Sequence, residues 1–193
     1  MRLFYSAIYK LISVIHPLYW VLICKFPKVT FWGLPILDIH RKARLEIGEE
    51  TTINSRNRGY HISMHSPCKL MADAPGSKIC IGKKCRIHGT CIHAKKSITI
   101  GDRCLIAANT QIMDSNGHIS SFDKPLFRLT KTDEPKEIDI GNDVWIGANC
   151  IIMKGNKIGS NVIIQAGSIL PPNGTYPDNC LIGGNPARIL ANK

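Results

Sequence analysis

A long polar segment, residues 113–139, carries the clearest candidate for chemistry, a histidine at position 118. The segment reads MDSNGHISSFDKPLFRLTKTDEPKEID, so His118 directly follows Asn116 and Gly117. Long polar loops expelled from a regular scaffold are more often functional than accidental. Because an imidazole has an ordinary pKa of ~6.5, a histidine here can accept and return a proton near neutral pH. Asp114 could orient that imidazole, contact a substrate or simply form a turn.

The elements that must position this loop follow a six-residue period. Aliphatic residues recur at that spacing: Ile140, Ile146, Ile152, Ile158, Ile164 and Leu170. Four positions after each comes a small or compact residue, and glycine often follows the aliphatic residue directly. A helix of 3.6 residues per turn cannot produce this period, and plain strand alternation would not single out one position in six. The pattern predicts short strands joined by tight turns, three to each triangular coil of a parallel β-helix.

The period also divides the chain into two domains. Residues 29–190 are expected to form the β-helix. Within it, 29–46 is an irregular lead-in that can include short strands, and 54–78 contains longer coils or a protruding turn. One rung after Leu170 departs from the pattern, and the register returns at Ile182. Residues 1–28 are the only stretch that predicts a long helix.

The eight cysteines favour a structural role, because none of them forms a CxxC pair. Four fall at the small inward position of a rung: Cys85, Cys104, Cys150 and Cys180. A thiol there acts as a compact hydrophobe rather than as half of a disulfide or a zinc ligand. With no convincing signal peptide, this usage predicts a cytoplasmic location.

The net charge and the N-terminal segment indicate which kinds of ligand or surface the protein can bind. The net charge of +11 favours anionic partners such as phosphorylated cofactors, whereas no nucleic-acid-binding motif is present, so no nucleic-acid partner is expected. Lys10, His16 and Pro17 interrupt the apolar run near the N-terminus, which falls short of a membrane span of ~20 apolar residues. The segment suits peripheral contact with the inner membrane face; packing against the coil end or a neighbouring subunit is the alternative.

Residues 80–190 resemble the hexapeptide-repeat acetyltransferases, in particular the galactoside and maltose type and related enzymes of surface-polysaccharide synthesis. The motifs that carry the resemblance are the NGH of the loop, DVWIGANCIIMKG, VIIQAGSIL and GGNPARIL. The resemblance implies an all-β fold, a left-handed parallel β-helix of hexapeptide repeats with an ejected catalytic loop. It also implies a homotrimer with active sites in the clefts between neighbouring coils. The expected activity is acetyl-CoA-dependent O-acetylation of a sugar or glycan precursor, with acetyl-CoA as acyl donor and no metal.

By this resemblance His118 is the catalytic base. It would take the proton of the acceptor hydroxyl as the oxygen attacks the thioester, and then return a proton to the departing thiolate without a covalent enzyme intermediate. Ala148 and Ala166 are implied to line the CoA arm with backbone N–H groups that can stabilise an oxyanion. Arg188 is implied to meet the nucleotide phosphates. Trp145 could wall the same cleft or pack on the loop or a neighbouring subunit.

Two rival functions stay open. N-acetylation of an amino sugar or nucleotide sugar would use similar cofactor contacts and differ in the acceptor, whose contact residues have no secure counterpart around 89–95. A zinc enzyme similar to the gamma-class carbonic anhydrases is the other, since these are also left-handed β-helices. Its histidine ligands would come from four positions: His61, His65, His88 and His93. Neither upstream spacing is convincing, and that family does not need the loop around residue 118.

Overall fold

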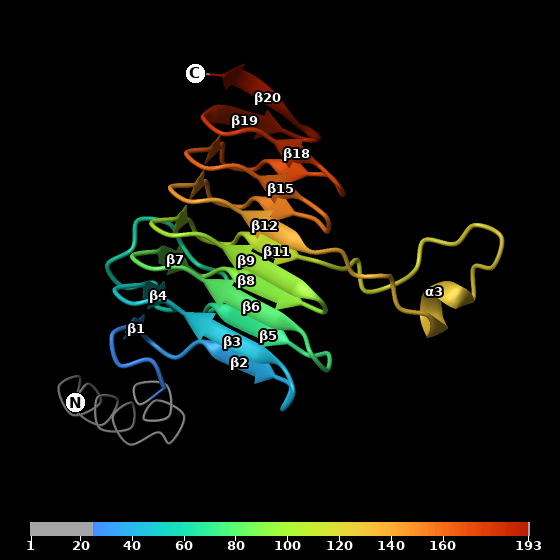
Figure 1. The fold of residues 1–193 in the computed structure, drawn as a ribbon, viewed down its shortest axis with the longest axis horizontal. Coiled ribbons are helices and arrows are strands. Elements are labelled where there is room, and N and C mark those ends of the chain that lie inside the picture. Colours follow the sequence, from blue (N-terminus) through green and yellow to red (C-terminus); the bar gives the residue numbers. More distant parts are fainter. Residues whose placement is uncertain (1–24, 193) are drawn as a thin grey trace.

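The computed structural model describes residues 25–192, which form a three-sided prism of stacked coils (Figure 1). Each coil contributes one strand to each of three parallel sheets, so the chain is a left-handed parallel β-helix, as predicted. Most of the predicted N-terminal helix, residues 1–24, lies outside the described residues. Within residues 25–192, no helix is long and apolar enough to cross a membrane.

The three sheets are named here the first, second and third faces. The first face contains, in spatial order, β1 (Thr30–Trp32), β4 (Thr52–Asn54), β7 (Arg86–His88), β10 (Leu105–Ile106), β13 (Trp145–Ile146), β16 (Ile163–Ile164), β19 (Cys180–Gly184) and β20 (Ala187–Asn192). The second contains β2 (Ile36–Ile39), β5 (Lys69–Ala72), β8 (Cys91–Ala94), β11 (Gln111–Met113), β14 (Ile151–Ile152) and β17 (Ile169–Leu170). The third contains β3 (Arg44–Ile47), β6 (Lys78–Ile81), β9 (Ser97–Ile100), β12 (Ile138–Ile140), β15 (Lys157–Ile158) and β18 (Thr175–Tyr176). Among the strands of residues 25–192, only β20 is antiparallel to its neighbour, β19.

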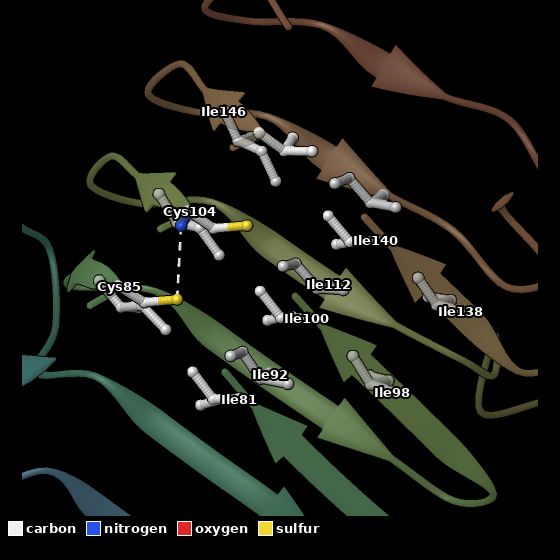
Figure 2. Packing of buried hydrophobic residues seen from close by; sticks show 14 of the residues in the cluster. Ile81, Cys85, Ile92, Ile98, Ile100, Cys104, Ile112, Ile138, Ile140 and Ile146 are labelled. Atoms are coloured by element: carbon white, nitrogen blue, oxygen red, sulfur yellow. Dashed lines mark hydrogen bonds between the residues drawn. The ribbon is translucent and has the colours of Figure 1, made fainter. Parts of the chain in front are cut away.

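The core is a set of isoleucine stacks, because the same inward position repeats in register from coil to coil (Figure 2). On the first face the stack is at most 1% exposed and comprises Ile87, Ile106, Ile146, Ile164 and Ile182. Burying each such side chain stabilises the fold by ~1.5–3 kcal/mol. Cys85, Cys104, Cys150 and Cys180 are buried free thiols in this core, as the sequence predicted.

Two stretches that looked irregular in the sequence are regular in the structure. β1, β2 and β3 pair in register with the next coil, so residues 30–47 form a complete coil rather than an irregular lead-in. Tyr176 fills the inward position six residues from Leu170 and from Ile182, and it is buried. At Tyr176 the spacing persists while the residue type changes. In the first coil β2 and β3 have 4 residues each, against 2 in β14 and β15, so the six-residue count is broken there.

Two longer segments leave the prism. Residues 55–68 connect β4 to β5, within the stretch predicted to contain longer coils or a protruding turn. Residues 114–137 connect β11 to β12 and project away from the coils, with the short helix α3 (Phe127–Thr130) at the far end (Figure 1). This is the expelled loop that the break in the period predicted.

Candidate active site

A column of alanines lines the corner between the first and second faces: Ala108, Ala148 and Ala166, called here the alanine column. The carbonyl of Ala108 accepts the N–H of Asn149 at 2.9 Å, and that of Ala148 accepts the N–H of Gly167 at 2.8 Å. These bonds stack the three alanines one above the other, one per coil. A β-carbon on Gly147 would lie 2.5 Å from the backbone nitrogen of Ala166, so only glycine permits this spacing.

The column leaves backbone donors available. In the part of the chain that the structure describes, neither the N–H of Ala148 nor that of Ala166 has an assigned acceptor. Both belong to turns fixed by the coils above and below, so they need no reorganisation to bind a ligand. The small side chains leave the backbone open to close approach. This corner therefore suits an extended ligand that accepts hydrogen bonds along its length.

A cavity of about 770 Å³ lies beside the column on the first face. Trp145, Ala148 and Ala166 all line it, so the structure brings together three of the four residues predicted to bind the cofactor. Trp145 is 50% exposed and forms part of the wall. Its predicted alternative role, in contact with another subunit, stays a prediction.

Arg188, the fourth of these residues, lies on β20 beyond the lining of this cavity. It pairs with Gly183 of β19, whose strand follows the coil that carries Ala166. Its side chain is exposed, with one guanidinium nitrogen donating to the carbonyl of Ala187 at 2.9 Å. A cation therefore stands at the C-terminal end of the corner that carries the alanine column.

His118 lines a different cavity, of about 640 Å³, and is exposed. Met113 and Met153 of the second face and Phe122 and Arg128 of the loop complete much of its wall. No residue lines both cavities. One copy of residues 25–192 thus keeps the predicted base and the alanine column apart.

Asp114 does not contact His118 through any assigned hydrogen bond among residues 25–192. Its carboxylate is fully buried and accepts the N–H groups of Lys95 at 2.8 Å, Lys96 at 2.7 Å and Ser97 at 2.9 Å. Burial raises the pKa of Asp114, and the three backbone donors oppose that rise. Both oxygens are engaged in holding the turn before β9. The geometry favours the turn-forming interpretation of Asp114 over its predicted catalytic role.

An ion pair that sequence reasoning missed anchors the root of the loop. Lys154 Nζ lies 2.5 Å from Asp133 Oδ2, and the two side chains are only 13% and 12% exposed. The same oxygen accepts the N–H of Asn116 at 3.0 Å, two residues before His118. Burial alone would raise the pKa of Asp133, but the bonds from Lys154 and Asn116 outweigh it and hold this pKa below its usual value. The pair, called here the loop clamp, joins both ends of the loop to the coil.

Two of the four histidines proposed as zinc ligands, His88 and His93, lie on different faces and have other partners. His88, on the first face, stacks on Tyr60 with ring centroids 4.3 Å apart, and its Nδ1 lies 3.2 Å from the amide nitrogen of Asn54. His93, on the second face, pairs with Asp73 at 3.1 Å. Across residues 25–192 no group of three or more possible metal ligands gathers. The carbonic-anhydrase alternative therefore gains no support from the described geometry.

Comparison with known families matches two parts of the chain. Residues 137–172 match the bacterial transferase hexapeptide (six repeats), and residues 78–113 match the hexapeptide repeat of succinyl-transferase. These two stretches are therefore similar to hexapeptide repeats found in transferases. The resemblance to hexapeptide-repeat acetyltransferases drawn from the sequence is confirmed.

The chain is also similar to individual acetyltransferases. Polysialic acid O-acetyltransferase of Escherichia coli O1:K1 / APEC is 32% identical over 138 residues, covering 67% of this chain and 42% of that protein. Galactoside O-acetyltransferase of Escherichia coli (strain K12) is 38% identical over 96 residues, covering 49% and 43%. The chain thus spans less than half the length of either relative. The solved galactoside acetyltransferase in complex with coenzyme A shares the fold, with a TM-score of 0.55 and 22% identity over 90% of this chain and 69% of that one.

Proposed function

We propose that this protein is an acetyl-CoA-dependent O-acetyltransferase that acts on a sugar or glycan acceptor. The alanine column is the observation that carries the proposal: its free N–H groups border a cavity that also contains Trp145. The named relatives support the choice of acceptor, since one is a polysialic acid O-acetyltransferase and the other a galactoside O-acetyltransferase. The solved relative with coenzyme A supports the choice of donor.

The chemistry follows from the groups available. The acceptor oxygen attacks the thioester carbonyl, a C–O bond forms, and the C–S bond breaks to release CoA. His118 accepts the hydroxyl proton and returns it to the thiolate, while a column N–H stabilises the oxyanion. A base in this role contributes ~10²–10⁴-fold to the rate.

We propose that the site is shared between copies in a homotrimer, because His118 and the alanine column line separate cavities of one chain. The loop that carries His118 projects from the prism (Figure 1) and exposes large apolar side chains, with Phe122 at 89%, Leu126 at 73% and Leu129 at 78%. Exposed apolar groups of this kind mark interaction surfaces. If a neighbouring copy covers these apolar side chains, His118 of the first copy would lie beside the alanine column of the neighbour.

A cytoplasmic location, with the N-terminal segment on the inner membrane face, is a further proposal supported by composition alone. The net charge is +11, and the segment combines basic residues with aromatic ones. Flotation with anionic vesicles compares the full chain with one lacking residues 1–28. Equal behaviour of the two would remove the idea.

The test of the function is thiol release from acetyl-CoA against a panel of sugars, amino sugars and nucleotide sugars. Acceptor-dependent release should fall by at least ~10² in His118→Ala and stay unchanged in the control Lys157→Ala, which replaces an exposed side chain on β15 of the third face. The acetylated product should lose its acetyl group in mild alkali, as an ester does. An alkali-stable amide would establish N-acetylation instead. Undiminished release in His118→Ala would refute the assignment of the base.

A further inference from the structure

Residues 55–68 form a fixed structure over the first face rather than a loose connection. The side chain of Asn57 binds Met64 in both directions, accepting its N–H at 2.5 Å and donating to its carbonyl at 3.0 Å. The side chain of Asn109 accepts the N–H of His65 at 2.9 Å and donates to the carbonyl of Ser63 at 3.0 Å. Since Asn109 directly follows Ala108, this segment is tied to the corner that carries the alanine column.

Tyr60 closes one end of the cavity beside that column. Its ring lies on the buried ring of His88, tilted by only 12°. His88 belongs to β7, which pairs with β10 of the coil that carries Ala108, so Tyr60 stands at the N-terminal end of the column. Burial raises the pKa of Tyr60, and the amide of Ala108 and the charge of Arg86 oppose the rise. Gly59, His61 and Ile62 line the same end.

Arg86 is the one permanent cation among the residues that line this cavity. Arg86 stands two residues before His88 on β7, is exposed and lines the cavity. Among residues 25–192 no carboxylate pairs with it. Burial lowers the pKa of His88 to about 4, and the charges of Arg86 and His61 add to that effect. His88 is thus neutral near pH 7 and does not share the charge of Arg86.

The two ends of the corner differ in what they can hold. Arg188 stands beyond the C-terminal end, in the position implied for the nucleotide phosphates, and Tyr60 stands at the other end. From Ala108 to Gly184, opposite Ala187 on β20, is three coil spacings, about 14 Å at ~4.8 Å each. A donor that extends from Arg188 along the column brings its thioester toward Tyr60. The acceptor then has to enter between Tyr60 and Arg86.

We propose that the cavity end formed by residues 55–68 and β7 is the acceptor subsite, and that it selects an acidic sugar whose carboxylate pairs with Arg86. This inference rests on the proposed function and adds the class of acceptor to it. A guanidinium binds a carboxylate bidentately, and a single unpaired arginine matches a single carboxylate. Tyr60 supplies a flat, rigid wall against which a sugar ring can pack.

The test measures kcat/KM with pairs of acceptors that differ in one charge. Methyl glycosides of galacturonic acid and of sialic acid are each compared with their methyl esters, using the full-length protein. The wild type should prefer an acid over its ester by at least ~10-fold. Arg86→Gln should lose that preference by lowering the value for the acid alone. Arg86→Lys should recover part of it, and Lys78→Gln, which removes an exposed cation on the third face, should keep all of it.

Three results would overturn the inference while leaving acetyl transfer intact. The wild type could use acids and esters equally well. Arg86→Gln could raise the KM for acetyl-CoA and spare the acceptors, which would assign the guanidinium to the donor. A sugar phosphate could outperform both acids by at least ~10-fold, which would assign the subsite to a phosphate. Failure of transfer to every acceptor would instead refute the proposed function and this inference with it.

Discussion

Replacing Lys154 by methionine should release the loop that carries His118 while the coils stay folded. The variant leaves Asp133 charged and mostly buried without its cation. Breaking a fully buried pair in this way costs ~3–5 kcal/mol, whereas an exposed pair contributes only ~0–1 kcal/mol. With side chains 13% and 12% exposed, the loop clamp lies nearer the buried case, so we expect about 2–3 kcal/mol. At 1.4 kcal/mol per factor of ten, the loop should open roughly 30- to 100-fold more often.

Limited digestion with trypsin measures that opening directly. Arg128 and Lys131 both lie on the projecting loop, so cleavage there reports how often the loop leaves its anchored position. The expected result is faster cleavage and a lower kcat for acetyl transfer, with the urea midpoint of the coils unchanged. Lys157→Met is the matched control, because Lys157 is an exposed lysine on the neighbouring β15.

Two outcomes would contradict the reasoning. If cleavage of the loop and kcat both stay at wild-type values, the pair does not hold the loop. If the urea midpoint of the coils falls in Lys154→Met, the pair stabilises the coils instead of the loop alone. The clamp should also fail in acid. Because the pKa of Asp133 is lowered on folding, its contribution is complete above the ordinary value of 3.8 and is lost as pH falls through the folded pKa.

Three other perturbations test the fold and the surface. Ile146→Ala removes a fully buried side chain and should cost ~2–5 kcal/mol in urea unfolding, whereas Ile163→Ala, at a position 41% exposed, should cost less than ~1 kcal/mol. His88 is neutral in the folded state with a pKa of about 4, so stability should fall by about 3 kcal/mol as pH drops from ~6.5 to ~4. Urea titrations at several pH values should show this slope in the wild type and not in His88→Gln; an equal slope in both would rule out His88 as its source. Leu126→Asp places a charge on the exposed apolar part of the loop and should shift the assembly toward single copies by sedimentation, and an unchanged mass would exclude that surface as a contact.

Much of this fold is predictable because one physical requirement repeats. Each inward position must hold a side chain that fills the same space inside the prism as the one in the next coil. Isoleucine and the small residues therefore recur at fixed positions, and the period becomes visible in the sequence. The same logic exposes the loop around His118 as the place where the period stops. It fails where residue type changes without a change in spacing, as at Tyr176. It also fails where strands lengthen and shift the count, as in β2 and β3, which carry Leu37 and Leu45.

The candidate site divides in the same way. Trp145, Ala148 and Ala166 could be found because they belong to periodic motifs, and the structure places them on one cavity. The loop clamp and the stack of Tyr60 on His88 could not, because each joins an aperiodic segment to a distant coil. Because such a segment has no repeat, the sequence does not predict which coil it contacts. The sequence left the role of Asp114 open for the same reason: its partners are backbone N–H groups of the preceding coil, which carry no sequence signal.

The central claim is that His118 of one copy serves the alanine column of another, and mixed assemblies test it most directly. Two inactive variants are co-expressed: His118→Ala, which lacks the base, and Ala166→Trp, which blocks the column at an exposed position and so should spare the coil. Each alone should transfer acetyl groups at least ~10² more slowly than the wild type. In randomly mixed trimers, about a quarter of the sites should combine an intact base with an intact column, and activity should return to about that fraction. Activity that stays at the level of the single variants would contradict a shared site.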